Sequence, residues 1–414
     1  MKRLILLVPA VLLCLCLCSC SNDVLSQDAK EMIDFDNAAV KEQEDNDLIF
    51  NRSKPFAGAW LSYLELTYPE NAYDKEQYAG YIDGLLENVE KIGISDVFVH
   101  AVSFSDAIYP SEIYPSSERL AGKRGDKLPF DFLDLIIERA KKHNLRVHAW
   151  LNPYRIQSQF DESRLCKSET AYRLLISGSG DVIKADGGLY YNPASERVIR
   201  LVTDAVKELL SGYELAGIHI DDYFYPPCES GFDKEQYAGY QKCGGKESLD
   251  EWRRENVNKL VRSLYSTVKS FGEDKLFTIS PGGDMEKDIN IHYADVKRWL
   301  QEDGYCDILI PQIYFGFENE SQPFEKCFED WKNAACGDTG LAVGLALYKA
   351  GKTDEFAGES GKNEWTQNSD IIARQVQSIL KSGTDGFCLY SVKFVNFNEK
   401  ETQNLYNMLY SKEK

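Results

Sequence analysis

In Gly217-Ile218-His219-Ile220-Asp221-Asp222-Tyr223-Phe224-Tyr225-Pro226, a short apolar strand pattern ends in two adjacent carboxylates and runs into aromatic rings. Side chains alternate faces along a strand, so the isoleucines share one face while His219, Asp221 and Tyr223 share the other. Polar groups at the carboxyl ends of strands are what a (β/α)8 barrel presents to its substrate. The alternative is a capped strand end whose aspartates hold loop amides.

Apolar strand patterns alternate with helical patterns from about residue 55 to the end of the chain. The strands are predicted near 56–64, 95–102, 146–152, 217–222, 276–281, 307–314, 341–348 and 386–391. Eight such units in unbroken order favour a closed parallel barrel, although an open doubly wound sheet shares the alternation. No Gly-x-Gly-x-x-Gly or P-loop motif supports the open sheet. We therefore predict an α/β fold with one (β/α)8 TIM-barrel domain at 53–414.

The amino-acid composition limits the kinds of molecule that this protein can bind. The 414-residue chain has a net charge of −19, which argues against nucleic acid or anionic lipid headgroups, because both attract basic surfaces. The 24 Tyr, 20 Phe and 6 Trp residues fit carbohydrate stacking, and they fit a large core equally well. We expect a polysaccharide or oligosaccharide substrate, a monomer, and neither nucleic acid nor cofactor.

The N-terminal segment has the pattern of an export signal. A basic start at Lys2 and Arg3 precedes an apolar stretch at 4–17, which is short for a membrane-spanning helix. The stretch ends in Leu-Cys-Ser-Cys, which resembles a bacterial lipoprotein signal and implies that Cys20 is lipidated after cleavage. An ordinary secretory signal is the alternative. Residues 21–52 are polar and acidic, as in a flexible tether, so we predict an exported protein anchored by lipid to the extracytoplasmic face of the bacterial cell membrane.

Asp221 and Asp222 are the leading candidates for catalytic carboxylates. Glycoside hydrolysis needs one protonated carboxyl to donate to the leaving oxygen, and one ionised carboxylate as nucleophile or base. Adjacent acids on a strand are expected to point to different sides, so a partner from another strand gives better geometry. Asp106 and Glu65 are the first choices for that partner, although an acid in such a position is more often an ordinary loop acid. A shared site would drive the two pKa values apart.

Polar and aromatic side chains near the other strand ends are predicted to bind the sugar. They are His100, His148, Asn152, Tyr154, Arg155, His219, Tyr223, Tyr225, Gln312, Tyr314, Tyr348 and Lys349. Several of these aromatic residues fit the barrel core equally well, and His148 and His219 can instead be hydrogen-bonded barrel residues. The two histidines with Asp221 and Asp222 could also bind a metal, but the spacing does not demand one and we predict none.

Six segments resemble one known family, and three of them are Trp252-Arg253-Arg254-Glu255-Asn256-Val257-Asn258, Gly344-Leu345-Ala346-Leu347-Tyr348-Lys349 and Gly361-Lys362-Asn363-Glu364-Trp365. The other three are His148-Ala149-Trp150-Leu151-Asn152-Pro153-Tyr154-Arg155, the opening segment at 217–226, and Pro311-Gln312-Ile313-Tyr314, and all six look like glycosyl-hydrolase-like family-10 proteins. The resemblance runs in order from about Phe56 to Ser391. It implies a (β/α)8 barrel, often on a bacterial lipoprotein, with glycosidase activity that in some relatives is directed at peptidoglycan glycan strands.

We therefore expect an exported glycoside hydrolase that uses carboxylate acid/base chemistry. Its substrate would be a cell-wall polysaccharide or another bacterial or environmental polysaccharide. Two alternatives stay open, which are a non-catalytic glycan-binding surface lipoprotein and a metal-dependent polysaccharide deacetylase.

Overall fold

The computed structural model describes residues 55–67, 74–226 and 231–410. The export signal, Cys20 and the segment 21–52 lie outside these ranges, so the lipid anchor and the tether stay predictions. Within these ranges, no helix has the length and apolar character that a membrane crossing requires.

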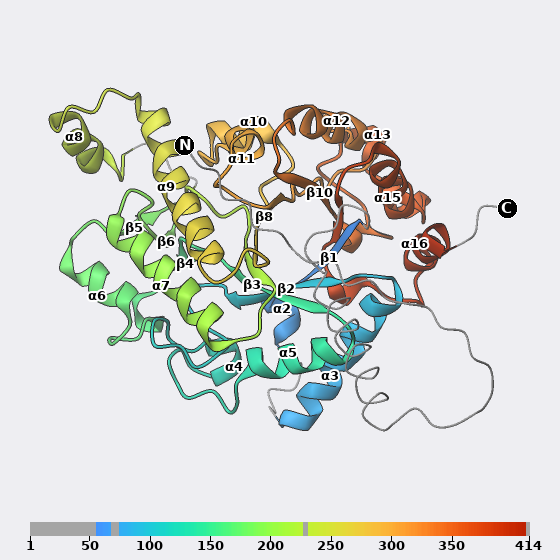
Figure 1. The fold of residues 1–414 in the computed structure, drawn as a ribbon, viewed down its shortest axis with the longest axis horizontal. Coiled ribbons are helices and arrows are strands. Elements are labelled where there is room, and N and C mark those ends of the chain that lie inside the picture. The colour runs from blue at the N-terminus through green and yellow to red at the C-terminus, as the bar shows by residue number, and fades with distance from the viewer. Residues whose placement is uncertain (1–54, 68–73, 227–230, 411–414) are drawn as a thin grey trace, which may run out of the picture. The chain divides into compact units, whose positions relative to one another are not determined.

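Eight parallel strands close into a barrel, which confirms the predicted TIM-barrel fold. Around the barrel the order is β1-β11-β10-β9-β8-β7-β3-β2, and Figure 1 shows the helices arranged outside these strands. The strands are β1 (Phe56–Leu61), β2 (Asp96–Val102), β3 (Arg146–Leu151), β7 (Gly217–Ile220), β8 (Leu276–Ile279), β9 (Ile308–Leu309), β10 (Gly340–Leu345) and β11 (Gly386–Leu389). Nearly all of their residues are buried, because a parallel sheet covered by helices has no solvent face.

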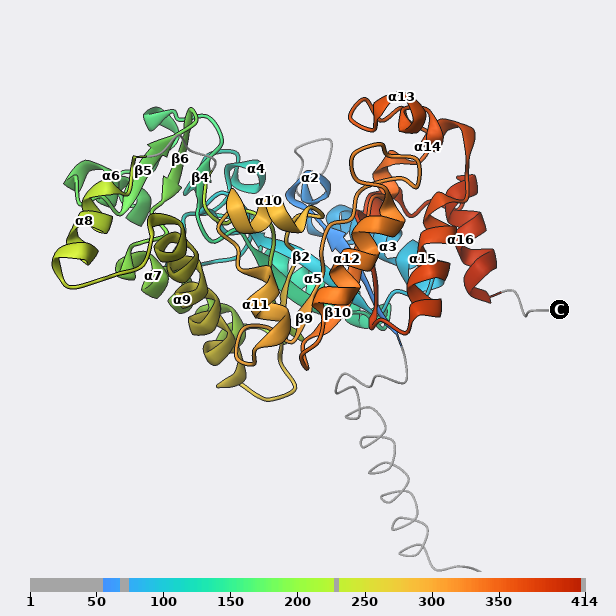
Figure 2. The ribbon, with the colours of Figure 1, turned by 90° about the horizontal axis from the view of Figure 1, so that it is seen from above.

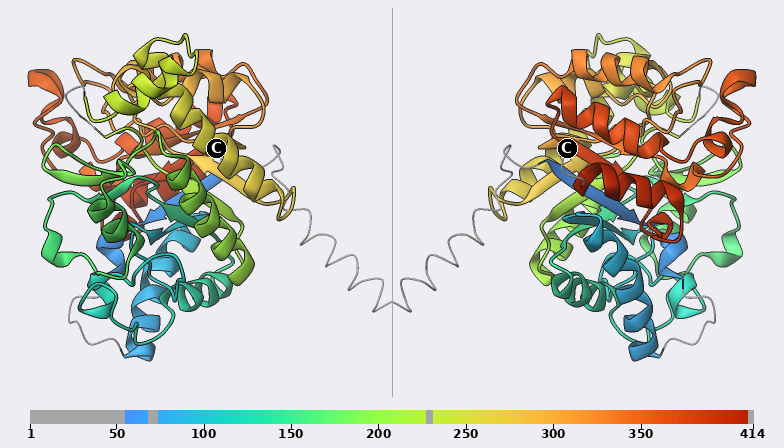
Figure 3. Two further views of the ribbon diagram at one scale, coloured as in Figure 1. Left: turned by 90° about the vertical axis from the view of Figure 1, so that its left-hand side faces the viewer. Right: turned by 90° about the vertical axis from the view of Figure 1, so that its right-hand side faces the viewer.

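The helices form where apolar residues recur at helical spacing behind a capping side chain. In α7 the buried residues Val198, Val202 and Leu209 lie on one stripe, and the hydroxyl of Ser195 accepts a hydrogen bond from the Val198 amide to start the helix. The main helices are α3 (Lys75–Lys91), α5 (Phe132–Lys142), α7 (Glu196–Gly212), α9 (Leu249–Lys269), α11 (Val296–Gln301), α12 (Phe324–Ala334), α15 (Ile371–Ser382) and α16 (Lys400–Tyr410). Figure 3 shows α7 and α9 packed together on one side, and α15 and α16 on the opposite side.

One glycine is required by the close approach of two barrel strands. A Cβ atom on Gly217 would collide with the carbonyl oxygen of Leu276 on the neighbouring strand β8. Glycine therefore lets β7 pair with β8 at the start of the strand whose other end carries Asp221 and Asp222.

The connections that follow the strands contain elements that the sequence patterns did not reveal. Residues 155–194 hold an antiparallel sheet of order β4-β6-β5, built from β4 (Arg155–Gln157), β5 (Val182–Ala185) and β6 (Gly188–Tyr191). Short helices are α2 (Tyr63–Leu66), α4 (Glu118–Ala121), α6 (Thr170–Ser177), α8 (Lys234–Lys242), α10 (Met285–Asn290), α13 (Gly358–Gly361) and α14 (Glu364–Gln367), with 3-10 turns at Glu162–Arg164, Leu347–Lys349 and Val392–Phe394. Figure 2 shows the small sheet, α2, α4 and α13 on the same side of the barrel.

Candidate active site

A pocket of about 230 Å³ opens among the residues that follow the barrel strands. Its lining residues are Trp60, Tyr63, His100, Trp150, Arg155, Asp221, Asp222, Tyr223, Gln312, Tyr314, Tyr348 and Tyr390. They come from every part of the chain but converge here, because parallel strands all end at the same rim of the barrel. The pocket is therefore rich in aromatic rings and contains two carboxylates.

Asp221 and Asp222 both line this pocket, contrary to the expectation that they point to different sides. The reason is that β7 ends at Ile220, so the alternation of a strand does not extend to the two aspartates. The acids are therefore brought together by the turn that follows the strand.

Asp221 is buried and held by neighbouring side chains. Asn152 Nδ2 donates a hydrogen bond to Asp221 Oδ1 at 2.5 Å, and the Tyr223 amide donates to the same oxygen at 3.4 Å. Burial, together with the charge of Asp222, raises the pKa of Asp221 to about 7, although Arg155 and Asn152 oppose the rise. Asp221 can therefore carry a proton near neutral pH, as a general acid must.

Asp222 is the second carboxyl of the pair. Burial raises its pKa, while His292, Arg155 and the Gln312 side chain favour the charged form. The negative charge of one carboxylate raises the free energy of ionising the other, so over a range of pH the pair carries one proton between them. A pair with one proton contains both an acid and a base.

Asn152 links Asp221 to Arg155 and His100, two hydrogen-bond donors that line the pocket. Its Oδ1 accepts hydrogen bonds from Arg155 Nη2 at 2.6 Å and from the ring Nε2 of His100 at 3.0 Å. Burial, and then the charge of Arg155, lowers the pKa of His100 well below its ordinary value, so the ring is neutral. The two donors fix the amide orientation of Asn152, and the amide in turn fixes Asp221.

Aromatic side chains form much of the remaining surface. The rings of Tyr314 and Tyr348 lie 5.9 Å apart, Tyr390 lies 5.9 Å from each of them, and Trp60 lies 6.1 Å from Tyr390. Tyr223 is 44% exposed at the opening, and the Arg155 guanidinium lies 3.9 Å from its ring centroid. Flat apolar faces beside carboxylates suit the binding of sugar rings.

Residues 55–359 match the glycosyl hydrolase-like 10 family. The chain belongs to this family. It is 32% identical over 313 residues to glycosyl hydrolase YngK of Bacillus subtilis (strain 168), over 70% of this chain and 60% of that relative, so it spans less than two thirds of the relative's length. It is 27% identical over 401 residues to glycosyl hydrolase DigH of Escherichia coli (strain K12), over 87% of this chain and 88% of that protein.

Solved structures of glycoside hydrolases share the barrel. The glycoside hydrolase domain of PgaB (BpsB) from Bordetella bronchiseptica superposes with a TM-score of 0.60 at 12% identity, over 87% of this chain and 100% of that one. A β-galactosidase from the haloarchaeon Halorubrum lacusprofundi gives a TM-score of 0.54 at 11% identity, over 85% of this chain and 57% of that one. These structures show the fold, and the family supports glycoside hydrolysis as the class of activity.

Glu65 and Asp106, the predicted partner carboxylates, do not line the pocket of this glycosyl hydrolase-like 10 protein. Glu65 accepts hydrogen bonds from the amide and hydroxyl of Ser62 at 2.6 Å each, in a capping box that starts α2, and also from the hydroxyl of Ser391. Asp106 accepts from the Ser103 hydroxyl at 3.1 Å and from the Phe104 amide at 2.9 Å. Both acids accept hydrogen bonds from groups of their own loops and neither lines the pocket, so their part in catalysis stays a prediction.

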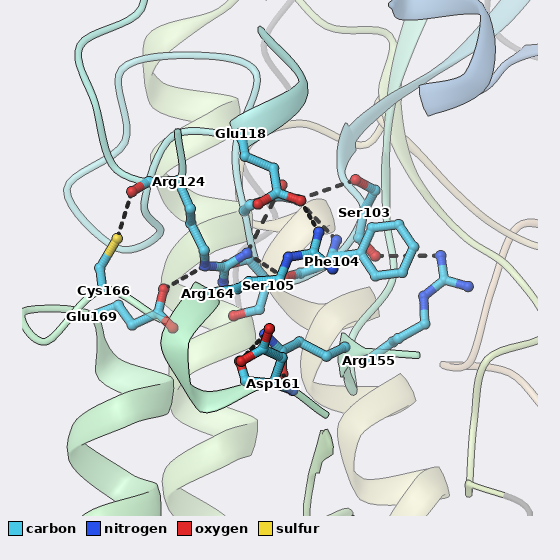
Figure 4. A network of polar contacts seen from close by, with 12 residues as sticks. Ser103, Phe104, Ser105, Glu118, Arg124, Arg155, Asp161, Arg164, Cys166 and Glu169 are labelled. Atoms are coloured by element: carbon cyan, nitrogen blue, oxygen red, sulfur yellow. Dashed lines mark hydrogen bonds and ion pairs between the residues drawn. The ribbon is translucent and has the colours of Figure 1, made fainter. Parts of the chain in front are cut away.

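Asp106 interacts with Ser103 and Arg124 of the polar network drawn in Figure 4, which the pocket residue Arg155 joins by donating to the Ser103 carbonyl oxygen. Arg124 lies 3.9 Å from Asp106, pairs with Glu169 at 2.7 Å, and donates to the carbonyl oxygens of Phe104 and Ser105. The network ties the loop after β2 to the segment that precedes α6.

His148 and His219 lie inside the barrel, so the prediction that they bind sugar is corrected. His148 Nε2 is 2.7 Å from Asp96, and both side chains are fully buried. His219 accepts from Trp60 Nε1 at 3.0 Å, so its Nδ1 donates to the Thr278 hydroxyl at 2.8 Å. The two histidines therefore do not converge with the aspartates, and no cluster of three or more His, Cys, Asp or Glu side chains suited to a metal occurs in the described part of the chain.

Four other predicted sugar-binding residues also lie outside the pocket lining, and one of them is Asn152, which contacts the pocket residues Asp221, Arg155 and His100. Tyr154 is fully buried in the core, and Tyr225 donates its hydroxyl hydrogen to Asp233 at 2.9 Å. Lys349 binds the Tyr314 carbonyl oxygen at 2.8 Å and pairs with Asp354 at 2.6 Å. Lys349 therefore contacts the backbone of Tyr314, which is a pocket residue.

The sequence prediction left four aromatic residues of the pocket out of the site, namely Trp60, Tyr63, Trp150 and Tyr390. Three of them were detectable as aromatic residues at the carboxyl ends of predicted strands, while Tyr63 lies on the short helix α2. Behind the pocket, burial and then the charge of Asp222 raise the pKa of Asp288 well above its ordinary value. No local sequence signal marks Asp288, because its position depends on the packing of α10.

Proposed function

We propose that this chain is an exported, lipid-anchored glycoside hydrolase that cleaves a cell-wall polysaccharide or another bacterial or environmental polysaccharide, including the glycan strands of peptidoglycan. The single observation that carries the proposal is the paired carboxyls of Asp221 and Asp222 in an aromatic pocket at the mouth of a barrel. The names of the relatives, glycosyl hydrolases YngK and DigH, support the same class of reaction.

The chemistry follows from the protonation of the pair. Asp221, with its pKa raised to about 7, donates a proton to the glycosidic oxygen as the bond to the anomeric carbon breaks. Asp222 in its charged form faces the positive charge that develops on the sugar ring. Trp60, Tyr314 and Tyr390 exclude water around the ring and strengthen these electrostatic interactions.

The lipid anchor is supported by the N-terminal sequence, where an apolar stretch ends in Leu-Cys-Ser-Cys at Cys20. Metabolic labelling with an alkyne fatty acid tests it directly. Labelled protein is expected from the native chain and not from Cys20→Ala, and unlabelled native chain would contradict the anchor.

Digestion of glycans tests the enzymatic proposal. The full chain, purified in detergent, is incubated with intact peptidoglycan, with peptidoglycan stripped of its peptides, and with a panel of other bacterial polysaccharides. Mass spectrometry of the soluble products is expected to show new oligosaccharides, and Asp221→Asn is expected to lose about 10²–10⁴-fold in rate, as removal of a general acid does.

Asp204→Asn is the matched control, because this acid lies on the exposed face of α7, where it pairs with Lys207. It is expected to keep the wild-type rate. Binding of a glycan by wild-type protein without any products would support a glycan-binding lipoprotein and refute the hydrolase. Release of acetate without new oligosaccharides, abolished by chelation, would instead favour the metal-dependent deacetylase.

A further inference from the structure

We infer that Phe356 stacks on a sugar ring of the glycan at a subsite outside the pocket, so that long chains bind more tightly than short ones. The subsite is contributed by the connection that joins β10 to α15. The inference rests on the proposed function, because the sugar ring beyond the pocket belongs to the same glycan that the pocket residues act on.

The first observation is the exposure of the Phe356 ring. Its side chain is 93% exposed, against 61% for Leu64 and 44% for Tyr223 at the pocket opening. Leaving a phenylalanine ring in water forgoes the stabilisation that burying it would bring. Single exposed apolar residues are common on proteins, so what distinguishes this ring is how it is held and where it lies.

The backbone around Phe356 is fixed by hydrogen bonds. Asp354 is 5% exposed and Ala357 is 2% exposed, so buried residues stand close to the exposed ring in the chain. The Asp354 carboxylate accepts a hydrogen bond from the Phe356 amide at 3.3 Å, and the Asp354 carbonyl oxygen accepts one from the Ala357 amide at 3.1 Å. The Ala357 carbonyl oxygen accepts from the Glu320 amide at 2.9 Å, which ties this turn to the connection after β9. The turn therefore holds the ring out in solvent.

The second observation is that the same turn is connected to the wall of the pocket. Lys349 Nζ donates to the carbonyl oxygen of Tyr314 at 2.8 Å and pairs with Asp354 Oδ2 at 2.6 Å. Tyr314 lines the pocket, and the other oxygen of the Asp354 carboxylate holds the Phe356 amide. One lysine and one carboxylate therefore separate the backbone of Phe356 from a pocket residue, which fixes the ring at the rim of the pocket.

The third observation is that the pocket is too small to enclose a polysaccharide. Its volume of about 230 Å³ is below the roughly 300–1,000 Å³ of a pocket that encloses a drug-sized ligand, so the glycan has to continue outside it. β7 and β10 are three places apart around the ring of eight strands, so the connections that carry Tyr223 and Phe356 leave the barrel on different sides of its mouth. Figure 2 shows α13, which begins two residues after Phe356, on the same side of the barrel as α2. A chain that leaves the pocket past Tyr348 therefore passes the connection that carries Phe356, whose flat apolar ring suits the C–H face of a sugar.

Binding measured against chain length tests the subsite. The probes are peptide-free peptidoglycan glycan strands, sorted into short and long fractions and titrated by calorimetry into the full chain in detergent. Every protein in this series carries Asp221→Asn, so that the strands are bound without being cut. Addition of Phe356→Ala is expected to weaken the binding of long strands by about 2–10-fold, as loss of an aromatic stack does, and to leave short strands unaffected. Phe356→Tyr keeps a flat ring and is expected to keep the affinity for both fractions.

Phe271→Ala is the matched control for the loss of an exposed ring. Phe271 is 38% exposed in the connection from α9 to β8, which leads into the start of a strand and so lies at the opposite end of the barrel from the pocket. Its removal is expected to leave both affinities unchanged. In the protein with Asp221 intact, Phe356→Ala is expected to raise KM for long strands by the same factor and to leave kcat unchanged. Thermal unfolding shows that each variant is folded.

The outcomes distinguish the subsite from the proposed function. Long strands that bind equally well with and without Phe356→Ala would overturn the inference and leave a glycoside hydrolase. Equal weakening for short and long strands would also overturn it, because the ring would then act at the pocket itself. Self-association that Phe356→Ala abolishes without a change in glycan affinity would overturn it in favour of contact between two copies of the chain, and strands that bind at no length would overturn it as well. Length-dependent binding that Phe356→Ala weakens, with no cleavage of any glycan, would remove the proposed function and keep the subsite.

Discussion

Replacement of Asn152 by alanine is expected to extend activity to higher pH. The substitution removes the hydrogen bond at 2.5 Å to Asp221 Oδ1, which favours the charged carboxylate. A hydrogen bond to a charged group is worth about 1.5–3 kcal/mol. At about 1.36 kcal/mol for each pKa unit, the pKa of Asp221 should rise by about 1–2 units. A general acid works while it is protonated, so the alkaline limb of the pH–rate profile should move up by that amount.

The assay is kcat/KM for glycan cleavage from pH 4 to about pH 10, because its pH limbs report the free enzyme. Gln312→Leu is the matched control, since Gln312 favours the charged form of Asp222 instead. This variant should move the acidic limb upward, because Asp222 has to be ionised. An alkaline limb that is unchanged or shifted downward in Asn152→Ala would refute the assignment of Asp221 as the acid.

Three further substitutions or treatments test other parts of the structure. Asp96→Asn leaves the buried His148 without its partner and should lower the free energy of unfolding by about 3–5 kcal/mol in urea at pH 7. Burial opposes the ionisation of Asp96, but His148 and Arg146 outweigh burial and lower the pKa of this carboxyl. The stability that Asp96 contributes is therefore present above its ordinary pKa of 3.8 and is lost as the pH falls further. At low pH the free energies of unfolding of Asp96→Asn and wild type should converge. Tyr223→Ala removes the stacked ring next to Arg155 and should raise KM by roughly 2–5-fold with kcat unchanged, whereas a fall in kcat alone would contradict a binding role. Treatment with EDTA should leave the cleavage rate unchanged, because His148 and His219 are engaged by protein groups, and a loss restored by zinc would contradict that expectation.

The barrel could be predicted from the sequence because its strands are short, buried and regularly spaced. Asp221 and Asp222 could be found because they follow such a strand directly. The roles of Glu65 and Asp106 could not be predicted, because the groups that bind them are set by the fold. Ser391, which donates to Glu65, lies 326 residues away in the chain. The end of a strand fixes where a side chain lies. Whether that side chain can reach a substrate depends on hydrogen-bond partners that are far away in the sequence.

One repeated segment shows the same limit. Asp-Lys-Glu-Gln-Tyr-Ala-Gly-Tyr occurs at 74–81 and at 233–240, and it starts a helix in both places, α3 and α8. At the first site Asp74 caps the helix, because its carboxylate accepts hydrogen bonds from the backbone amides of Glu76 and Gln77. At the second, Asp233 is buried and pairs with Arg253 at 2.7 Å. Local sequence determines the helix, and tertiary packing determines the role of its first residue.

The placement of both carboxyls on consecutive residues has a consequence for how the site responds to heat. Acids on two different strands separate whenever thermal motion widens the barrel, and the rate then declines before the protein unfolds. Asp221 and Asp222 are joined by one peptide unit, so such breathing carries them together and keeps their Cα atoms about 3.8 Å apart. Activity should therefore keep rising with temperature until the barrel itself melts, and a more heat-resistant enzyme can be sought by strengthening the barrel alone.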